Sequence, residues 1–411
     1  MKAHIAAMTT SYDIIIAGGG LNGATMALGA AKLGLSTLVI DANPDHSQMQ
    51  EHFDGRSYAM ALTSVRLMRA LGLWDQLSKH AQPMLDIKVF DGSVGQGPSP
   101  FFLHFDHNEI EEGPMGHMVE DRHLRPVLQD AIRRSEKITY LTQTKIIDQR
   151  VDERGITVTC DDQTTYGAKL LIGADGRQSE TATRAGIRRT GWRYEQTALV
   201  CAIEHERPHN GIAYQYFMPA GPLAILPLCE NRCSIVWSET PENATTIMSL
   251  GDADYLDILR PRFGSFLGEI ALAGQRFSYP LGLTMANDFI APRVALIGDA
   301  AHGIHPIAGQ GLNAGLRDIA VLCDVIQSAC ERGEDFSSPA VLDRYQEWRR
   351  FDNQTLALAT DSFNKLFSNN NPVLRFGRTL GMGLINKFPS ARRSFIREAA
   401  GLSGELPRWM S

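Results

Sequence analysis

Two glycine-rich segments far apart in the chain hold the residues best suited to bind a cofactor. The first is Gly18-Gly19-Gly20-Leu21-Asn22-Gly23, and the second runs from Gly298-Asp299 to Asn313. Each follows a short apolar run and leads into a predicted helix, whose free N–H groups and positive dipole end favour an anionic or electron-rich ligand. Two such turns at this separation predict one long cofactor lying across a discontinuous domain. FAD is the cofactor that this arrangement favours.

The early segment matches the G-x-G-x-x-G fingerprint of dinucleotide-binding folds. Gly18 would allow the tight turn, Gly20 would let the backbone approach a pyrophosphate, and Gly23 would let the helix pack on the strand. Asp41 follows the strand predicted over 37–40, where a carboxylate binds adenosine ribose hydroxyls and repels a 2′-phosphate. A plain glycine loop with a helix-capping aspartate is the alternative. The complete βαβ pattern favours FAD or NAD.

A second fingerprint, which a stable NAD(P)H-binding domain would need, is missing from the middle of the chain. Residues 172–177, with the sequence Ile-Gly-Ala-Asp-Gly-Arg, occupy that region and contain Asp175. Taken alone, this pattern predicts only a buried strand that meets an Asp-Gly turn.

Composition excludes several classes of protein. The chain has 411 residues, is 44% hydrophobic and 21% charged, and carries a net charge of −6, which argues against a nucleic-acid binder. Six scattered cysteines suggest a reducing, cytoplasmic location, and no segment is long and apolar enough to span a membrane. We expect no metal site at Cys229 and Cys233 or at His302 and His305. A general-base role for either histidine stays open, although a structural histidine bonded to the backbone is favoured.

The pattern of apolar residues predicts an α/β protein with a discontinuous, Rossmann-like FAD-binding lobe made of 11–85, 105–195 and 282–342. A mostly antiparallel substrate-binding sheet would come from 86–104 and 196–281, followed by a helical C-terminal tail over 343–411. Helices are predicted over 24–33, 57–71, 124–134 and from about 318 to 401. Predicted strands cover 12–17, 37–40, 156–160, 170–173, 197–203, 213–218, 223–228 and 233–237.

In this order and spacing, the early fingerprint, the central Asp-Gly motif and the late Gly-Asp motif resemble the FAD-dependent aromatic hydroxylases (group A flavoprotein monooxygenases). Within that family the chain is similar to the branch that hydroxylates ubiquinone precursors. The closer match rests on residues 56–62, 71–74, 217–228 and 298–318.

The resemblance implies roles for further residues. Arg56 and Arg122 would reach the ribityl–pyrophosphate part of FAD, where arginines neutralise phosphates. Asp299 would bind ribityl hydroxyls or phosphate, and Asp175 and Arg177 would face the cofactor groove and the path of NAD(P)H. The late loop would hold the isoalloxazine ring through Pro306 and through the backbone of Gly309, Gln310, Gly311, Leu312 and Asn313.

The resemblance also implies the chemistry. NAD(P)H would reduce FAD, O₂ would form a flavin C4a-hydroperoxide, and one oxygen would pass to an aromatic ring, expected to be a polyprenylated phenol. No catalytic side chain is assigned. A flavin-dependent halogenase is disfavoured because no tryptophan stands in the W-x-W-x-I-P signature of that class. A scaffold subunit of a ubiquinone-synthesis complex and a hydroxylase of another aromatic substrate remain alternatives.

The tail contains a basic, amphipathic stretch. Six basic residues between positions 372 and 400 oppose the single acidic Glu398, and apolar residues alternate with them. Such a helix either lies on the anionic inner face of a membrane or packs on the FAD-binding lobe, and packing is favoured. Peripheral association with a membrane or a biosynthetic complex is therefore a further expectation.

Overall fold

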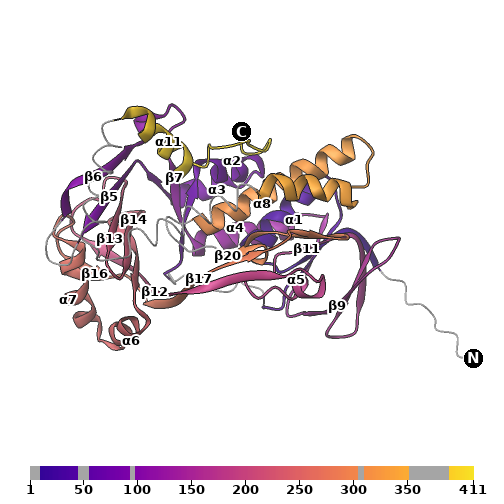
Figure 1. Ribbon diagram of the computed structural model, residues 1–411, viewed down its shortest axis with the longest axis horizontal. Helices are drawn as coiled ribbons and strands as arrows, with labels where there is room; N and C mark the ends of the chain where they lie inside the picture. The colour runs from indigo at the N-terminus through magenta and orange to yellow at the C-terminus, as the bar shows by residue number, and fades with distance from the viewer. Residues whose placement is uncertain (1–9, 45–54, 93–97, 304–309, 351–387) are drawn as a thin grey trace, which may run out of the picture.

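The computed structural model describes residues 10–44, 55–92, 98–303, 310–350 and 388–411. An α/β lobe and a sheet lobe lie side by side, and the long strands β12 (Arg189–His205) and β17 (Phe277–Ala286) extend between them (Figure 1). The predicted fold class is confirmed. The domain boundaries stay a prediction, because these two strands run on across the junction.

The α/β lobe is built on an eight-stranded sheet with a parallel core in the order β19-β11-β1-β2-β8. Residues Ile14 to Ile16 in its central strand are fully buried, as expected where helices and strands cover both faces. The parallel strands are β1 (Thr10–Ala17), β2 (Thr37–Ile40), β8 (Ile138–Leu141), β11 (Thr165–Gly173) and β19 (Val294–Leu296). The antiparallel additions are β9 (Ile146–Val151), β10 (Ile156–Cys160) and β18 (Ile290–Ala291).

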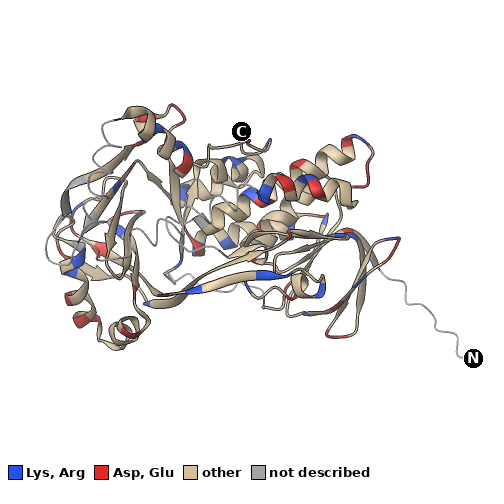
Figure 2. Cartoon of the chain, in the orientation of Figure 1, with Lys and Arg blue, Asp and Glu red and all other residues tan. Residues whose placement is uncertain are grey.

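Helices α1 (Leu21–Lys32), α4 (Asp121–Arg134) and α8 (Gln310–Glu331) belong to this lobe, and α1 contacts both of the others. The short helix α5 (Glu180–Arg184) follows β11, and the 3₁₀ turn η4 (Gly298–Ala300) follows β19. A further helix covers 339–350, and acidic and basic residues are mixed along it and along the end of α8 (Figure 2).

The second lobe is a nine-stranded sheet in the order β20-β17-β12-β15-β14-β13-β5-β6, with β16 also paired to β12. Its pairs are antiparallel except for β13 with β5. The strands not yet given are β5 (Asp86–Gly92), β6 (Pro98–Asp106), β13 (Ile212–Met218), β14 (Gly221–Leu228), β15 (Arg232–Glu239), β16 (Ile270–Leu272) and β20 (His302–Gly303). Helices α6 (Pro241–Ser249) and α7 (Asp252–Phe263) pack on it around the buried Trp237.

A small third sheet of β3 (Ser57–Ala61), β7 (Gly116–Glu120) and β4 (Ala81–Met84) shows that the helix predicted over 57–71 is partly wrong. Ser57 to Ala61 form a strand because every residue pairs with β7, and the helix α2 (Leu62–Ala70) begins only after them. Local propensity is overridden here by a partner strand distant in sequence. The short helices α3 (Trp74–Leu77) and η2 (Ser78–His80) follow.

The described part of the C-terminal tail packs on the protein. Helix α11 (Pro389–Ala399) lies against β6 and the 3₁₀ turn η3 (His107–Glu109), with Ile396 fully buried. Arg392 donates to Glu109 at 2.9 Å and Arg397 to Glu112 at 2.7 Å, so two of the basic residues form ion pairs. Within the described ranges, no helix combines the length and apolar character needed to cross a membrane.

Candidate functional site

The glycine turns and acidic residues singled out in the sequence meet at one edge of the parallel sheet. Gly18 N–H donates to the carbonyl of Ile40 at 2.8 Å, and Ala174 N–H donates to that of Ala17 at 2.8 Å. Ile297 N–H reaches the carbonyl of Gly173 at 3.0 Å. The carboxyl ends of β1, β2, β11 and β19 therefore lie next to one another, which is where open α/β sheets bind their ligands.

The early turn has the geometry that its glycines require. Gly18 has a φ of +99°, and a Cβ there would lie 2.5 Å from the carbonyl oxygen of Ala174. A Cβ on Gly23 would collide with the carbonyl oxygen of Gly18, so helix and turn pack in direct backbone contact. Gly20 is the N-cap of α1, and no side chain caps that helix. A Cβ on Gly20 would meet nothing within 4 Å, so there is open space beside this residue at the start of α1.

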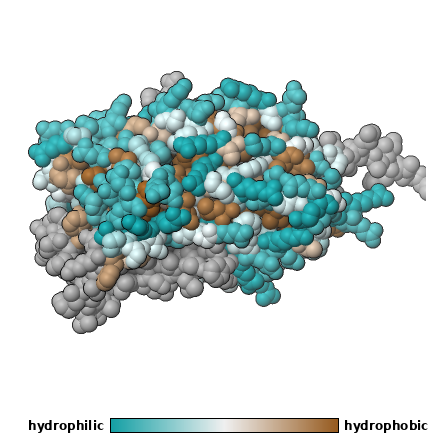
Figure 3. Space-filling view, turned by 90° about the horizontal axis from the view of Figure 1, so that it is seen from above, coloured by the Kyte–Doolittle hydropathy of each residue, from teal (hydrophilic) through white to brown (hydrophobic). Residues whose placement is uncertain are grey.

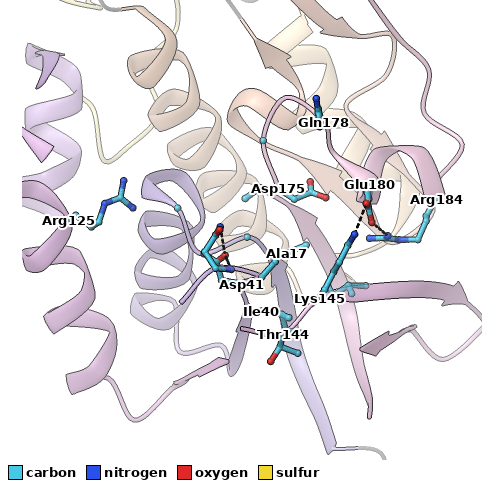
Figure 4. A pocket seen from close by; sticks show the side chains of 17 residues that line it. Ala17, Ile40, Asp41, Arg125, Thr144, Lys145, Asp175, Gln178, Glu180 and Arg184 are labelled. Atoms are coloured by element: carbon cyan, nitrogen blue, oxygen red, sulfur yellow. Dashed lines mark hydrogen bonds and ion pairs between the residues drawn. The ribbon is translucent and has the colours of Figure 1, made fainter. Parts of the chain in front are cut away.

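Asp41 lies at the end of β2 and is 4% exposed. One of its carboxylate oxygens accepts Gly19 N–H at 2.8 Å, and the other accepts the backbone N–H and side-chain amide of Asn43. The carboxylate thus holds the glycine turn and the loop after β2 together. A cavity of about 450 Å³ opens beside it (Figure 4).

The cavity beside Asp41 is lined from several elements. Arg125 approaches from α4 on one side, while Lys145, Glu180 and Arg184 stand on the other (Figure 4). Lys145 pairs with Glu180 at 2.9 Å, and Arg184 donates to the same carboxylate at 3.1 Å. None of these four residues was predicted from the sequence. Arg125 had a detectable signal, since it lies three positions after Arg122 on the same helix.

Asp175 also lines this cavity, and its carboxylate accepts hydrogen bonds from residues at the start of α5. It accepts hydrogen bonds from the Ser179 hydroxyl and from Thr181 N–H, the latter at 2.9 Å. Arg177, two residues further, donates to Asp299 at 3.3 Å, and both side chains are about half exposed. The central Asp-Gly motif and the late Gly-Asp motif are therefore joined by an ion pair.

Arg56 and Arg122 are held by buried carboxylates and are not among the described residues that line the cavity. Arg56 lies 3.5 Å from Asp121, and Arg122 donates to Glu120 at 2.8 Å. Asp121 also accepts the Tyr58 hydroxyl at 2.9 Å. Burial, together with this carboxylate, raises the pKa of Tyr58 well above its ordinary value, so the hydroxyl stays a donor. The roles of Arg56 and Arg122 toward a cofactor stay predictions.

The late Gly-Asp turn is fixed to α8 through one carboxylate. Asp318, which has no exposed atoms, accepts Gly298 N–H at 2.8 Å and is 2.6 Å from Nε2 of His302. Its other oxygen accepts Arg349 Nε at 2.8 Å. Burial alone would raise the pKa of Asp318, but His302 and Arg349 lower it below the ordinary value. His302 is thus structural, as favoured, but its partner is a carboxylate and not the backbone.

The remaining predicted residues belong to the late loop. Pro306 and Gly309, together with His305, lie outside the described residues. Gly311 and Leu312 are in the first turn of α8, and a Cβ on Gly311 would meet nothing within 4 Å.

Asn313, also at the start of α8, makes three hydrogen bonds through its side-chain amide. Its oxygen accepts Ala61 N–H at 2.9 Å and the Ser64 hydroxyl at 2.8 Å, while its nitrogen donates to the carbonyl of Ala59 at 2.7 Å. The start of α8 is thereby tied to β3 and α2.

A second, mostly apolar cavity lies between the small sheet, the nine-stranded sheet, α8 and α11. Its lining comprises Ala59, Ala61, Met84, Ile87, Met115, Ala213, Tyr214, Gln215, Leu226, Asn313 and Ala399. The sequence predicts a substrate site in the sheet lobe, but it indicates none of these lining residues for that role except by the general position of the lobe. Only the fold brings together residues from seven separate helices and strands around one space.

A metal site has weak support. Among the described residues one group, Asp86, Asp106 and His107, brings three possible ligand atoms within 4.8 Å of one another. Nδ1 of His107 is bonded to the carbonyl of Leu85 at 3.0 Å, and Asp86 pairs with His104 at 3.1 Å. These atoms therefore already have protein partners.

Comparison with known proteins agrees with this geometry. Residues 11–357 match the family model described as an FAD binding domain. Ubiquinone hydroxylase UbiL of Rhodospirillum rubrum is 42% identical over 401 residues, which cover 97% of this chain and 92% of that protein. The chain belongs to the family of FAD-dependent aromatic hydroxylases.

Other members of this family are similarly related. The 3-demethoxyubiquinol 3-hydroxylase of Escherichia coli is 33% identical, over 95% of this chain and 98% of that protein. Human ubiquinone biosynthesis monooxygenase COQ6 is 30% identical, over 93% of this chain and 91% of that protein. The fold resembles that of p-nitrophenol 4-monooxygenase PnpA from Pseudomonas putida, with a TM-score of 0.78, 20% identity and coverage of 97% and 100%. The predicted family and its ubiquinone branch are confirmed.

FAD is therefore the cofactor of this hydroxylase, with NAD(P)H as the co-substrate typical of the family. The strand-edge site fits such a group by its own geometry. The start of α1 is uncapped and has open space beside Gly20, as a pyrophosphate requires. The adjoining cavity beside Asp41 has room for a nucleoside.

Proposed function

We propose that this FAD-dependent hydroxylase acts on the aromatic ring of a polyprenylated phenol in ubiquinone biosynthesis, using NAD(P)H and O₂. The observation that carries this proposal is the apolar cavity lined from both lobes at the start of α8. An apolar cavity of this kind suits an uncharged, hydrophobic ring. The relatives named as ubiquinone hydroxylases support the same substrate class.

FAD would lie across the edge of the parallel sheet. Its adenosine would occupy the cavity beside Asp41, and its pyrophosphate would face Gly20 at the start of α1. Arg125 and Arg184 both line this cavity, while Arg122 is on α4 and Arg56 lies just before β3. Asp299 would bind the ribityl chain. The late loop with Pro306, Gly309, Gly311, Leu312 and Asn313 would carry the isoalloxazine ring.

Bound FAD would supply the redox chemistry, taking a hydride from NAD(P)H and activating O₂ for transfer of one oxygen atom to the ring. The protein must bind the ring, orient it and exclude water. Met84, Met115 and Leu226 surround the ring site with apolar groups. The half-exposed pair of Arg177 and Asp299 borders the proposed approach of NAD(P)H.

The experiment that tests this function uses the purified, FAD-loaded protein with NADH or NADPH and phenols that carry short isoprenyl chains. We expect oxidation of the nicotinamide and a product that gains one oxygen on the ring, with its position mapped by mass spectrometry. NAD(P)H consumption that yields only H₂O₂ with every phenol would contradict the proposed substrate class. A protein that stays colourless with added FAD would favour the scaffold alternative.

We also propose that the enzyme associates peripherally with anionic lipid through α11. Phe388 and Phe395 are exposed by 57% and 38%, and Arg393 between them is exposed as well. On the face that carries α11 and the C-terminus, apolar residues form small patches separated by hydrophilic ones (Figure 3). Such a surface favours weak, charge-assisted binding over deep insertion.

Sedimentation with liposomes tests the association. Full-length protein should sediment with anionic vesicles at low salt and remain in solution with neutral ones. The double substitution Phe388→Ser and Phe395→Ser should reduce binding without removing the buried Ile396. Binding that the substitutions leave unchanged, or that survives high salt, would rule out this surface.

A further inference from the structure

We propose that Gln215 recognises a ring oxygen of the substrate and that its cavity selects an uncharged phenol over an aromatic carboxylate. The inference rests on the proposed function, because it identifies the polar contact within the cavity assigned to the ring. It concerns a neutral amide on β13, in the middle of the nine-stranded sheet.

The strand alternation determines which way Gln215 points. The rings of its neighbours Tyr214 and Tyr216 stack on Phe90 at 6.5 and 5.1 Å, and Tyr214 also contacts Phe266 at 4.4 Å. These aromatic residues belong to the core on the side of the sheet that α7 covers. Successive side chains of a strand point to opposite faces. Gln215 therefore faces the other side, toward the small sheet, α8 and α11.

Among the polar side chains that the structure describes around this cavity, only one is available to hydrogen-bond a ring oxygen of the substrate. Of the lining residues, Tyr214, Gln215 and Asn313 have polar side chains. The ring of Tyr214 packs on the far side of the sheet, and the amide of Asn313 makes three hydrogen bonds to β3 and α2. Within the part of the chain that the structure describes, the amide of Gln215 makes no hydrogen bond.

Gln215 is only partly buried, so its amide is open to a ligand or to water in the cavity, and either can satisfy its hydrogen bonds. A glutamine amide carries an acceptor oxygen and two N–H donors. It can therefore accept from a phenol hydroxyl or donate to a methoxy or carbonyl oxygen without requiring charge on the ring.

The part of this cavity that the structure describes lacks a positively charged side chain that could stabilise a carboxylate on the ligand, so it favours an uncharged ring. None of the described residues that line it is an arginine, lysine or histidine. A carboxylate placed there would lose its hydration with no cation to compensate. Because Asn313 borders the same space, a ring bonded to Gln215 would lie beside the start of α8, where the late glycine segment ends.

Calorimetric titration of the FAD-loaded protein tests this recognition with three ligands. The first is a phenol with a short isoprenyl chain, the second lacks the hydroxyl, and the third carries a carboxylate in its place. We expect the wild-type protein to bind the phenol roughly 2- to 12-fold more tightly than the ring without oxygen, the range of one neutral hydrogen bond. The carboxylate should bind more weakly than either.

Gln215→Met keeps the length of the side chain and removes its hydrogen bonds. We expect this variant to bind the phenol and the oxygen-free ring equally and to release more H₂O₂ per NAD(P)H oxidised, with a raised KM for the phenol. Gln327→Met, on α8 where the amide bonds only Glu331, is the matched control and should keep the wild-type ratio. Gln215→Leu provides a second variant if the methionine variant loses FAD or its cooperative melting.

Outcomes that overturn the inference are distinct from those that overturn the proposed function. A Gln215→Met protein that folds, holds FAD and keeps the wild-type preference for the phenol refutes the role of Gln215. Equal or tighter binding of the carboxylate refutes the proposed selection. A wild-type protein that binds the phenol through Gln215 but never hydroxylates it leaves this inference standing and refutes the function.

Discussion

His302 and Asp318 share a 2.6 Å hydrogen bond between two side chains that have no exposed surface. The bond joins β20, just after the late Gly-Asp turn, to the middle of α8. Arg349 binds the other oxygen of the same carboxylate, and Gly298 N–H donates to it as well. One aspartate therefore fixes the turn that holds Asp299 relative to the helix that begins at the late loop.

Asp318→Asn should strongly destabilise the protein. The amide cannot balance the buried charge of Arg349, and breaking a buried pair by changing one partner costs about 3–5 kcal/mol. Chemical denaturation monitored by circular dichroism measures the free energy of unfolding. Asp257→Asn removes an exposed ion pair with Arg260 and serves as the control, with an expected loss below about 1 kcal/mol. Similar losses in the two variants would contradict the structural role of Asp318.

Asp299→Ala should weaken FAD binding about 10- to 150-fold, the effect of losing one hydrogen bond to a charged group. Fluorescence quenching during FAD titration measures the affinity. Because Asp299 also pairs with Arg177, Arg177→Ala is the matched control. An equal loss in both variants would mean that Asp299 acts through the ion pair and not through the cofactor.

Asp41→Ala should weaken FAD binding by a similar factor but should barely affect FMN, which lacks the adenosine half. The carboxylate also holds Gly19 and Asn43, so thermal melting of the protein without flavin must accompany the titrations. Equal losses for both flavins, with lowered melting, would show that Asp41 serves only to hold the glycine turn.

His117 should make stability depend on pH. Burial, and then the nearby Arg69, lower the pKa of His117 to about 4, and its ring packs edge-on against Trp74. An unfolded histidine has a pKa of about 6.5, so between these values the unfolded chain binds a proton that the folded protein does not. The stability that comes from keeping His117 neutral in the folded protein is fully present above pH 6.5 and is lost as the pH falls toward 4.

Urea unfolding of the wild type and His117→Phe at pH 7.5 and at pH 5 checks this expectation. The wild type should lose more stability on acidification than the variant, by about 1–2 kcal/mol. An identical loss in both proteins would place the titrating group elsewhere.

The cofactor, the family and most of the elements could be predicted from the sequence. Gly18, Asp41, Asp175 and Asp299 each lie in a turn just after a strand of apolar residues. Because the carboxyl ends of parallel strands meet at one edge of a sheet, these turns are expected to lie close together. Patterns of this kind depend only on residues close together in the sequence. They are sufficient to predict that these four positions meet at one edge of the sheet.

Tertiary structure decided the contacts that depend on a distant partner. Ser57 to Ala61 became a strand because β7 pairs with them, and Arg125 lines the cavity beside Asp41 because the fold places α4 there. The sequence could not show that Arg392 and Arg397 pair with Glu109 and Glu112, because opposite charges find each other only after the chain folds. Likewise, the position of the Gln215 amide can be interpreted only through the apolar cavity, which residues of seven separate helices and strands line.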